Sequence, residues 1–225
     1  MQSKATLLKI LQPISIILAA ALLVIMALAQ IRQTALLSLA VVICAMVPFL
    51  LRFERMRPKP RDIVPVVVLS VIAALGRALF IFAPNIQPVT AVVIVSGIVF
   101  GSQAGFLTGA LSALASNMIM GQGPWTPWQM LAWGLIGYAA GLLQSTPVFK
   151  KSVFVFVYGF IASFMFGWIM NVWNVYGFVK DASWQAYVLS CTLSSYFDLI
   201  HAVSTVVFLG LILIPWKKKL FRIKS

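Results

Sequence analysis

Long apolar segments alternate along the chain with short stretches that carry charges, amides, glycine or proline. A membrane-spanning helix needs about 20 predominantly apolar residues, and fewer where the bilayer thins around a short segment. The pattern therefore predicts an all-α fold, a polytopic transmembrane helical bundle. Its predicted segments are approximately Leu8–Ala29, Ala35–Leu51, Ile63–Phe82, Pro88–Phe100, Ala104–Met120, Trp128–Leu143, Val153–Val175 and Tyr187–Ile214.

The fourth and fifth of these segments are short, so residues 88–120 form either two short helices or one broken span. One proline-containing linker, residues 52–62, separates the first two segments from the later six. We expect an N-terminal transmembrane hairpin in residues 1–54 and a six-helix unit in residues 62–225. Leu, Ile, Val and Ala dominate the hairpin, so helix packing or lipid contact explains its composition and its role stays open.

Composition excludes an ordinary soluble domain. Hydrophobic residue types make up 62% of the 225 residues and charged types only 9%. A soluble domain is about half apolar and about a quarter charged, because its surface must face water. In a bilayer the surface faces lipid, so this composition fits a membrane protein.

The net charge of +13 is distributed in a way that favours a membrane protein over a nucleic-acid-binding protein. Fourteen of the 17 basic residues form four clusters that flank apolar segments: Lys4 and Lys9; Arg52, Arg55, Arg57, Lys59 and Arg61; Lys150 and Lys151; Lys217, Lys218, Lys219, Arg222 and Lys224. Eight spans with both termini in the cytoplasm place all four clusters inside, as the positive-inside rule requires. Only Arg32 and Lys180 then fall outside, and Arg77 lies within a span.

The predicted outside loops contain no charged residues and are rich in amides, aromatic rings, prolines and glycines. They are Ala83–Pro88, Gly121–Gln129 and the end of the seventh segment, Asn171–Tyr176. Amides both donate and accept hydrogen bonds, and aromatic rings offer flat contact area with a polar edge. These loops suit a large, polar, nearly neutral ligand with a flat apolar face. The alternative is an interfacial aromatic belt, which any membrane protein can have.

Asp198 and His201 lie three residues apart within the last segment and therefore share a helix face. A carboxylate at membrane depth is costly and marks a functional candidate. Either Asp198 forms a structural ion pair with Arg77, or Asp198 and His201 face a polar cavity. One histidine with one aspartate is a poor metal site. We assign no catalytic and no metal-ligating residue.

Small residues recur at the four-residue spacing that lets helix backbones approach closely. Gly101, Gly105, Gly109 and Ala113 form one such row, Gly137 and Gly141 another, and Ser70 and Ala74 a third. The chain also lacks a Gly-x-x-x-x-Gly-Lys-Ser/Thr loop, so uphill movement of a solute would need an ATPase partner.

From about Asp62 to its end, the chain resembles the substrate-binding S component of an energy-coupling factor (ECF) vitamin transporter. The resemblance rests on Gly76-Arg77, on the run from Pro84 to Thr90, on Ser116-Asn117 and on Asp198-Leu199-Ile200-His201. Its most specific part is Gly121-Gln122-Gly123-Pro124-Trp125-Thr126-Pro127-Trp128-Gln129-Met130, followed by Trp133-Gly134. The closest likeness within the group is to the cobalamin-specific members.

This resemblance implies a six-helix cup that opens to the outside and closes over a vitamin, with no cofactor of its own. Small residues of the first core helix, Ser70, Ala73 and Ala74, would meet a transmembrane coupling subunit that works with two ATPase subunits. The implied ligand is cobalamin (vitamin B12); pantothenate, lipoate or a queuosine precursor stay open. The candidate substrate-binding residues are Asn85, Gln87, Asn117, Gln122, Trp125, Trp128, Gln129, Trp133, Asn171, Trp173, Asn174, Tyr176, Tyr196, Asp198 and His201.

Two functions of other classes compete with this one. In the first alternative the chain is a membrane-embedded enzyme that uses Asp198 and His201. In the second it is a lipid-binding scaffold. Turnover of a substrate by the purified chain would distinguish the enzyme from an S component, which binds tightly without turnover.

Overall fold

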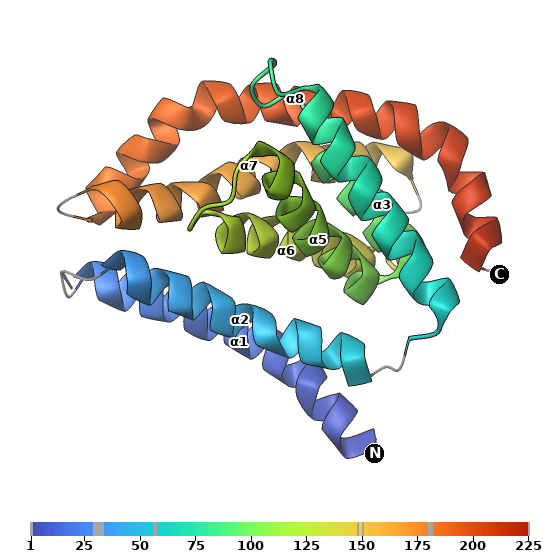
Figure 1. The fold of residues 1–225 in the computed structure, drawn as a ribbon, viewed down its shortest axis with the longest axis horizontal. Coiled ribbons are helices and arrows are strands. Elements are labelled where there is room, and N and C mark those ends of the chain that lie inside the picture. Colours follow the sequence, from blue (N-terminus) through green and yellow to red (C-terminus); the bar gives the residue numbers. More distant parts are fainter. Residues whose placement is uncertain are drawn as a thin grey trace.

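The computed structural model is a bundle of α-helices (Figure 1). It describes residues 2–28, 34–55, 58–147, 149, 151–179 and 182–224. In these residues there is no β-strand. The helices are α1 (Gln2–Leu28), α2 (Thr34–Arg55), α3 (Pro60–Leu79), α4 (Val89–Phe100), α5 (Ser102–Met120), α6 (Thr126–Leu143), α7 (Ser152–Phe178) and α8 (Trp184–Lys224).

Each predicted segment corresponds to one helix, and the helical fold class is confirmed. Residues 88–120 form two helices, because the chain turns at Gly101, where φ is +95°. Residues with a side chain rarely adopt this left-handed region, whereas glycine does so at little cost. The turn returns α5 alongside α4, where Ser96 Oγ lies 2.7 Å from Thr108 Oγ1.

Helix α4 lies at the centre of the bundle, and every residue from Val89 to Val99 is buried. It packs against α5, α6 and α8, while α3 covers α5 and α7 runs beside α8. In Figure 1, α8 arches across one face of this core and the α1–α2 hairpin runs along the opposite face. Two glycines of the predicted row on α5 lie against α6, since a β-carbon on Gly105 or Gly109 would overlap the backbone of α6. Gly97 of α4 makes the same close approach to α6. Close backbone approach of this kind is the usual use of small residues in membrane bundles.

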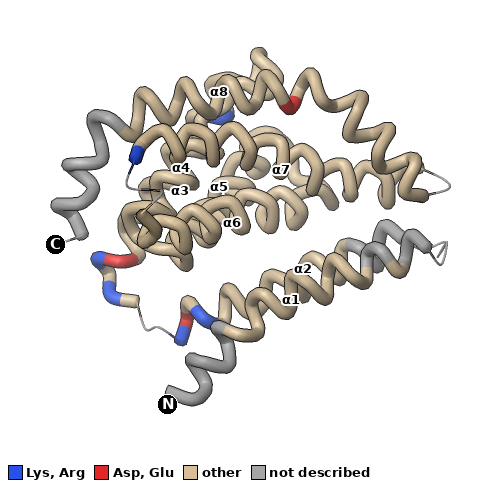
Figure 2. The backbone as a smooth tube through the Cα atoms, turned by 180° about the vertical axis from the view of Figure 1, so that it is seen from behind, with Lys and Arg blue, Asp and Glu red and all other residues tan. Residues whose placement is uncertain are grey.

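The described helices include three, α3, α7 and the part of α8 from Trp184 to Leu213, that are long and apolar enough to cross a membrane. Figure 2 shows most of the described Lys and Arg residues gathered at one end of the bundle. Arg77 is apart from them, because it lies in the last turn of α3 whereas Lys59 and Arg61 lie at the start of that helix. Both chain ends lie toward this end as well (Figure 1). Arg32, Arg57, Lys150 and Lys180, which belong to the predicted charge pattern, lie outside the described residues, as do the side chains of Lys4, Lys9 and the C-terminal cluster.

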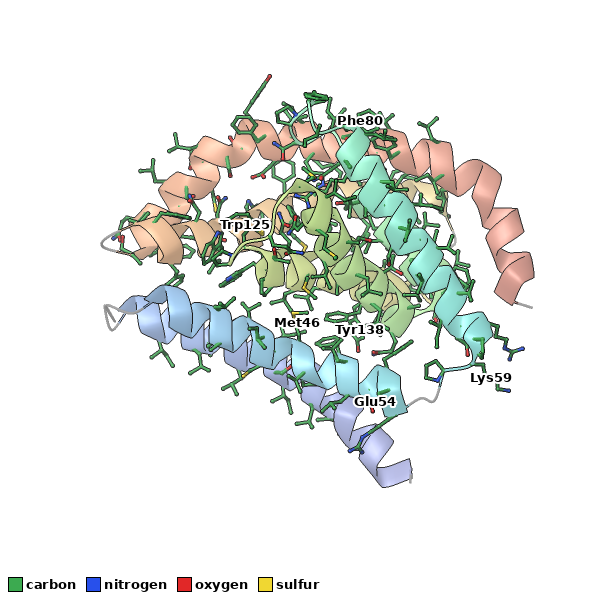
Figure 3. The ribbon with its side chains drawn as sticks, viewed as in Figure 1. Met46, Glu54, Lys59, Phe80, Trp125 and Tyr138 are labelled. Carbon is green, nitrogen blue, oxygen red and sulfur yellow. The ribbon has the colours of Figure 1, made fainter. Side chains whose placement is uncertain are left out.

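A polar contact joins the N-terminal hairpin to the core. Arg52 Nη1 of α2 donates to Gln12 Oε1 of α1 and, at 3.4 Å, to Tyr138 Oη of α6. The Tyr138 hydroxyl also donates to Gln12 Oε1 at 3.0 Å. Beside this contact the rings of Phe49 and Phe106 stack with centroids 4.1 Å apart. Figure 3 shows Tyr138 and Met46 between the hairpin and the core.

The small residues of α3, which the resemblance assigns to a coupling-subunit contact, face inward within the described chain. Ser70, Ala73 and Ala74 are all buried, and the Ser70 hydroxyl lies 3.3 Å from the carbonyl oxygen of Thr108 in α5. These small side chains let α3 approach α5 closely. The exposed side of α3 carries large apolar residues instead, among them Val67, Val71 and Leu75.

Candidate functional site

A cluster of polar side chains lies where α3 ends, remote from the basic end of the bundle. Arg77, in the last turn of α3, reaches α5, and its Nη1 donates to Ser116 Oγ at 2.7 Å and to Asn117 Oδ1 at 2.8 Å. Its guanidinium also lies 5.1 Å from the ring centroid of Trp133 in α6, within the range of a cation–π contact. Three helices therefore hold this one cation.

The ion pair between Arg77 and Asp198 that the sequence suggested is not formed. The Asp198 carboxylate accepts a hydrogen bond from Ser194 Oγ at 3.0 Å and lies against Gly167 of α7, where an added β-carbon would overlap it. Arg77 instead takes neutral partners on α5. The two charges are separated because α8 presents Asp198 to α7, while α3 presents Arg77 to α5 and α6.

A chain of amides and hydroxyls connects Arg77 to the α5–α6 loop. Asn117 Nδ2 donates to Gln129 Oε1 at 2.8 Å and to Thr126 Oγ1 at 2.9 Å. The Thr126 hydroxyl donates to Gln122 Oε1 at 2.9 Å, and Gln122 Nε2 donates to the carbonyl oxygen of Leu114 at 3.1 Å. The structure thus brings together Asn117, Gln122 and Gln129 of the predicted site.

The sequence of the α5–α6 loop explains its shape. Pro127 stands in the first turn of α6, where the missing N–H of proline costs nothing. Gly123 lies so close to the ring of Trp125 that a β-carbon there would overlap the indole. Trp125 remains 36% exposed and is the most accessible aromatic side chain of this loop.

A second polar contact is centred on Thr90 in the first turn of α4. Thr90 Oγ1 accepts a hydrogen bond from Trp133 Nε1 at 3.0 Å and lies 2.8 Å from His201 Nε2 of α8. Phe166 of α7 packs on both rings, stacked on Trp133 at 4.4 Å and edge-on to His201 at 5.3 Å. His201 and Trp133 are almost completely buried, and the Thr90 hydroxyl supplies the partner of Trp133 Nε1 and of His201 Nε2.

The α3–α4 loop is tied to α8 through its backbone. Gln87 N donates to Ser204 Oγ at 3.0 Å, and the Gln87 side chain is buried. Asn85 adopts a positive φ of 63°, a conformation that asparagine tolerates better than most residues. The loop therefore has a defined shape beside the Arg77 end of α3.

The predicted amides of α7 connect helices in the described structure. Asn171 Nδ2 donates to Ser194 Oγ at 2.8 Å, and Asn171 Oδ1 accepts from Ser190 Oγ at 3.0 Å. Asn174 Nδ2 donates to the same Ser190 at 3.2 Å. Their hydrogen bonds fasten α7 to α8 and lie apart from the Arg77 cluster.

The remaining predicted residues are dispersed. Trp173 is buried and meets the ring of Phe178 edge-on at 5.8 Å. Tyr196 is 67% exposed on α8, with its ring beside Phe197. In the described part of the chain, no group of three or more His, Cys, Asp and Glu side chains is arranged to hold a metal ion.

A largely apolar cavity of about 790 Å³ lies between the hairpin and the core. Ile16 of α1 and Val42 of α2 line one side, Trp128 and Ile169 another, and Tyr176 and residues 182–185 also contribute. The sequence indicated Trp128 and Tyr176 but not that the hairpin would help to enclose them. Trp128 Nε1 is enclosed and has no hydrogen-bond partner.

Three hydroxyl residues belong to the polar clusters but were absent from the predicted site. Thr90 contacts Trp133 and His201, and Thr126 bonds to Asn117 and Gln122. Ser116 bonds to Arg77, which the sequence suggested only as an ion-pair partner of Asp198 and not as a site residue. All three lie in the runs that carry the family resemblance, and that position was the available signal. Single Ser and Thr residues within apolar segments do not recur at a regular spacing, so the hydrophobic pattern did not mark them as site residues.

The model of one protein family matches residues 61–218 of the chain, and the family is described as "ECF-type riboflavin transporter, S component". The match begins beside the predicted boundary between the hairpin and the six later helices. No solved structure matches the chain.

Proposed function

The chain belongs to the family of ECF-type riboflavin transporter S components, and we propose that it captures a vitamin outside the cell for import by an ECF complex. In such a complex the S component binds the small molecule, a transmembrane coupling subunit receives it, and two ATPase subunits supply the energy. The family match over residues 61–218 is the observation that carries this proposal. It disfavours the enzyme alternative, because the family is one of transport subunits.

The ligand is proposed to bind at the end of the bundle that bears the Arg77 cluster. Two observations support this end. It is remote from the basic residues, which the positive-inside rule assigns to the cytoplasm together with both termini (Figure 2). It also carries Trp125 and the α3–α4 loop, which Figure 3 shows far from Glu54 and Lys59.

Cobalamin is the ligand that we propose. Its corrin ring is flat and apolar, and a fringe of amide side chains surrounds the ring. Gln122, and Gln129 held by the buried Asn117, offer amide groups of both polarities, and Trp125 offers an accessible ring. Riboflavin, which the family description names, is the second candidate because its ring system is also flat and hydrogen-bonding.

Binding to the full chain purified in detergent tests this function. Cobalamin, riboflavin, pantothenate, lipoate and a queuosine precursor are titrated separately by calorimetry. We expect tight binding of cobalamin, which also colours the purified protein red, and no chemical change of the bound molecule. Tight binding of another of these compounds would replace cobalamin as the ligand, and turnover of any of them would overturn the S-component assignment.

A second arm tests transport. Cells that express the chain together with an ECF module should take up labelled cobalamin, and cells that express the chain alone should not. A Walker-motif variant of the ATPase subunits serves as the control. Uptake that survives this variant would contradict the need for ATPase partners.

A further inference from the structure

We propose that Arg77 binds an anionic group of the transported molecule, which in cobalamin is the phosphodiester of its nucleotide loop. This inference rests on the proposed function and adds a chemical requirement to it. The ligand must carry a phosphate or carboxylate, and Arg77 must be the residue that distinguishes it from a neutral analogue.

The surroundings of Arg77 in the described part of the chain supply no compensating negative charge. The structure describes three acidic residues, Glu54, Asp62 and Asp198. Glu54 lies between Arg52 and Arg55 at the end of α2, and Asp62 accepts a hydrogen bond from Lys59 N at the start of α3. Asp198 is bonded to Ser194 beside Gly167. None of the three pairs with Arg77. A cation within a membrane-spanning helix is costly, and an anion that binds there reduces this cost.

Arg77 has N–H donors that the described structure leaves without a hydrogen-bond partner. A guanidinium has five N–H groups. In the described structure both hydrogen bonds of Arg77 come from Nη1, to Ser116 and Asn117. Nε and Nη2 have no hydrogen-bond partner there, and neither is among the enclosed polar atoms. These donors therefore reach accessible surface.

The guanidinium of Arg77 is held in a fixed position. The bonds to Ser116 and Asn117 hold one nitrogen, and the Trp133 ring lies against the guanidinium. These contacts restrict the side chain without neutralising it. A held guanidinium with a free edge matches the paired oxygens of a phosphate or carboxylate, because two parallel N–H donors meet two acceptors.

The neighbouring side chains explain why a phosphodiester within a larger, amide-rich molecule is the favoured form. Gln129 and Gln122 extend from Asn117 toward the α5–α6 loop, so neutral hydrogen-bonding groups continue from the cation. A molecule with one anionic group and many amides matches this order. Cobalamin has that composition, and cobinamide, which lacks the nucleotide loop, keeps the amides and loses the phosphodiester.

The experiment compares cobalamin with cobinamide on the full chain in detergent. Three variants are used with the native protein. Arg77→Gln removes the positive charge, and Arg77→Lys keeps the charge but lacks the two parallel N–H donors of the guanidinium. Asn117→Asp adds a carboxylate beside Arg77 at nearly constant side-chain volume. The Gln129 amide can reverse to present its NH2 group to the new carboxylate, and the Thr126 hydroxyl can turn from Gln122 to donate to it. Melting temperatures identify variants that fail to fold.

We expect Arg77→Gln and Asn117→Asp to weaken cobalamin binding by roughly 10- to 100-fold, the range for a lost hydrogen bond to a charged group. The affinity for cobinamide should change by less than about threefold in Arg77→Gln and in Asn117→Asp. This change is well below the effect of losing one hydrogen bond to a charged group. The cobalamin affinity of Arg77→Lys should lie between those of the native protein and Arg77→Gln, whereas its cobinamide affinity should show no such intermediate effect. A purely structural Arg77 would weaken both corrinoids equally, and this result would overturn the proposal.

Two further outcomes are informative. If a lipid headgroup supplies the phosphate at Arg77, the cobalamin-to-cobinamide affinity ratio will be the same in all four proteins, which also overturns the proposal. If neither corrinoid binds the native protein, the cobalamin assignment fails, and flavin mononucleotide against riboflavin becomes the deciding pair. Preference for the phosphorylated flavin, lost in Arg77→Gln, would support the role of Arg77, whereas any other result would overturn it.

Discussion

Gly105 of α5 and Gly137 of α6 lie backbone against backbone, so that a β-carbon added to either would overlap the carbonyl group of the other. Gly105→Ala should therefore push the two helices apart and lower the stability of the protein by about 1–3 kcal/mol, the usual effect of overpacking. Thermal unfolding in detergent measures it. Gly210→Ala in α8 is the control, since the nearest atom to its added carbon is Phe156 Cε1 at 4.0 Å. Equal melting temperatures for the two variants would contradict close packing of α5 on α6.

Thr90 supplies one hydroxyl to two buried groups, the indole of Trp133 and the imidazole of His201. Thr90→Val keeps the shape and removes that hydroxyl. We expect a loss of about 1–3 kcal/mol of stability, because buried polar groups lose their partner. Thr192→Val is the matched control, because the exposed Thr192 hydroxyl bonds only to the backbone of its own helix. Equal melting temperatures for Thr90→Val and the native protein would show that this contact contributes nothing to stability.

Ala74→Trp tests the inward orientation of the small residues on α3. Ala74 is 2% exposed, so the indole has no room and the bundle should be overpacked by about 1–3 kcal/mol. Melting temperature and ligand affinity should fall together. Val71→Trp, one turn earlier at a 47% exposed position, should leave both unchanged. A folded, binding-competent Ala74→Trp protein that fails only in uptake would restore this face as the contact for a coupling subunit.

Trp125 is the aromatic side chain of the α5–α6 loop that a ligand reaches most easily. Trp125→Ala should weaken ligand binding by about 1–3 kcal/mol, the size of a lost ring contact or hydrogen bond, with little change in melting temperature. Calorimetry on the purified chain measures the affinity. Tyr196→Ala provides the comparison, because Tyr196 projects from α8 and is 67% exposed. If Tyr196→Ala weakens binding and Trp125→Ala does not, the ligand lies along α8 and not at the loop.

The sequence predicted the helices well, because a helix within a bilayer depends on local properties. An apolar segment of sufficient length forms a helix wherever it lies in the membrane, since its backbone groups must bond within the segment. The sequence left open whether residues 88–120 form two helices, and the structure places the turn at Gly101, where φ is +95°. The grouping of basic residues at one end follows from charge positions that the sequence displays directly.

The candidate site was predicted only in part. Asn117, Gln122 and Gln129 are adjacent along one loop and one helix end, so their association followed from the sequence. Asn171 and Asn174 have the same residue type, yet they bond to serines of α8. Residue type cannot distinguish an amide that joins two helices from an amide that faces a ligand, because both need the same polarity.

Partners across the bundle were decided by the tertiary structure alone. Arg77 and Asp198 are oppositely charged and both lie at membrane depth, which suggested a pair, but the helices turn them toward different neighbours. The spacing of Ser70 and Ala74 predicted a side of α3 that another helix could approach closely, but it did not indicate which helix. In the structure that helix is α5. The sequence determined which segments form helices and where charge lies. The packing of helices decided which polar groups meet, because that depends on the rotation and crossing of whole helices, and no local pattern records it.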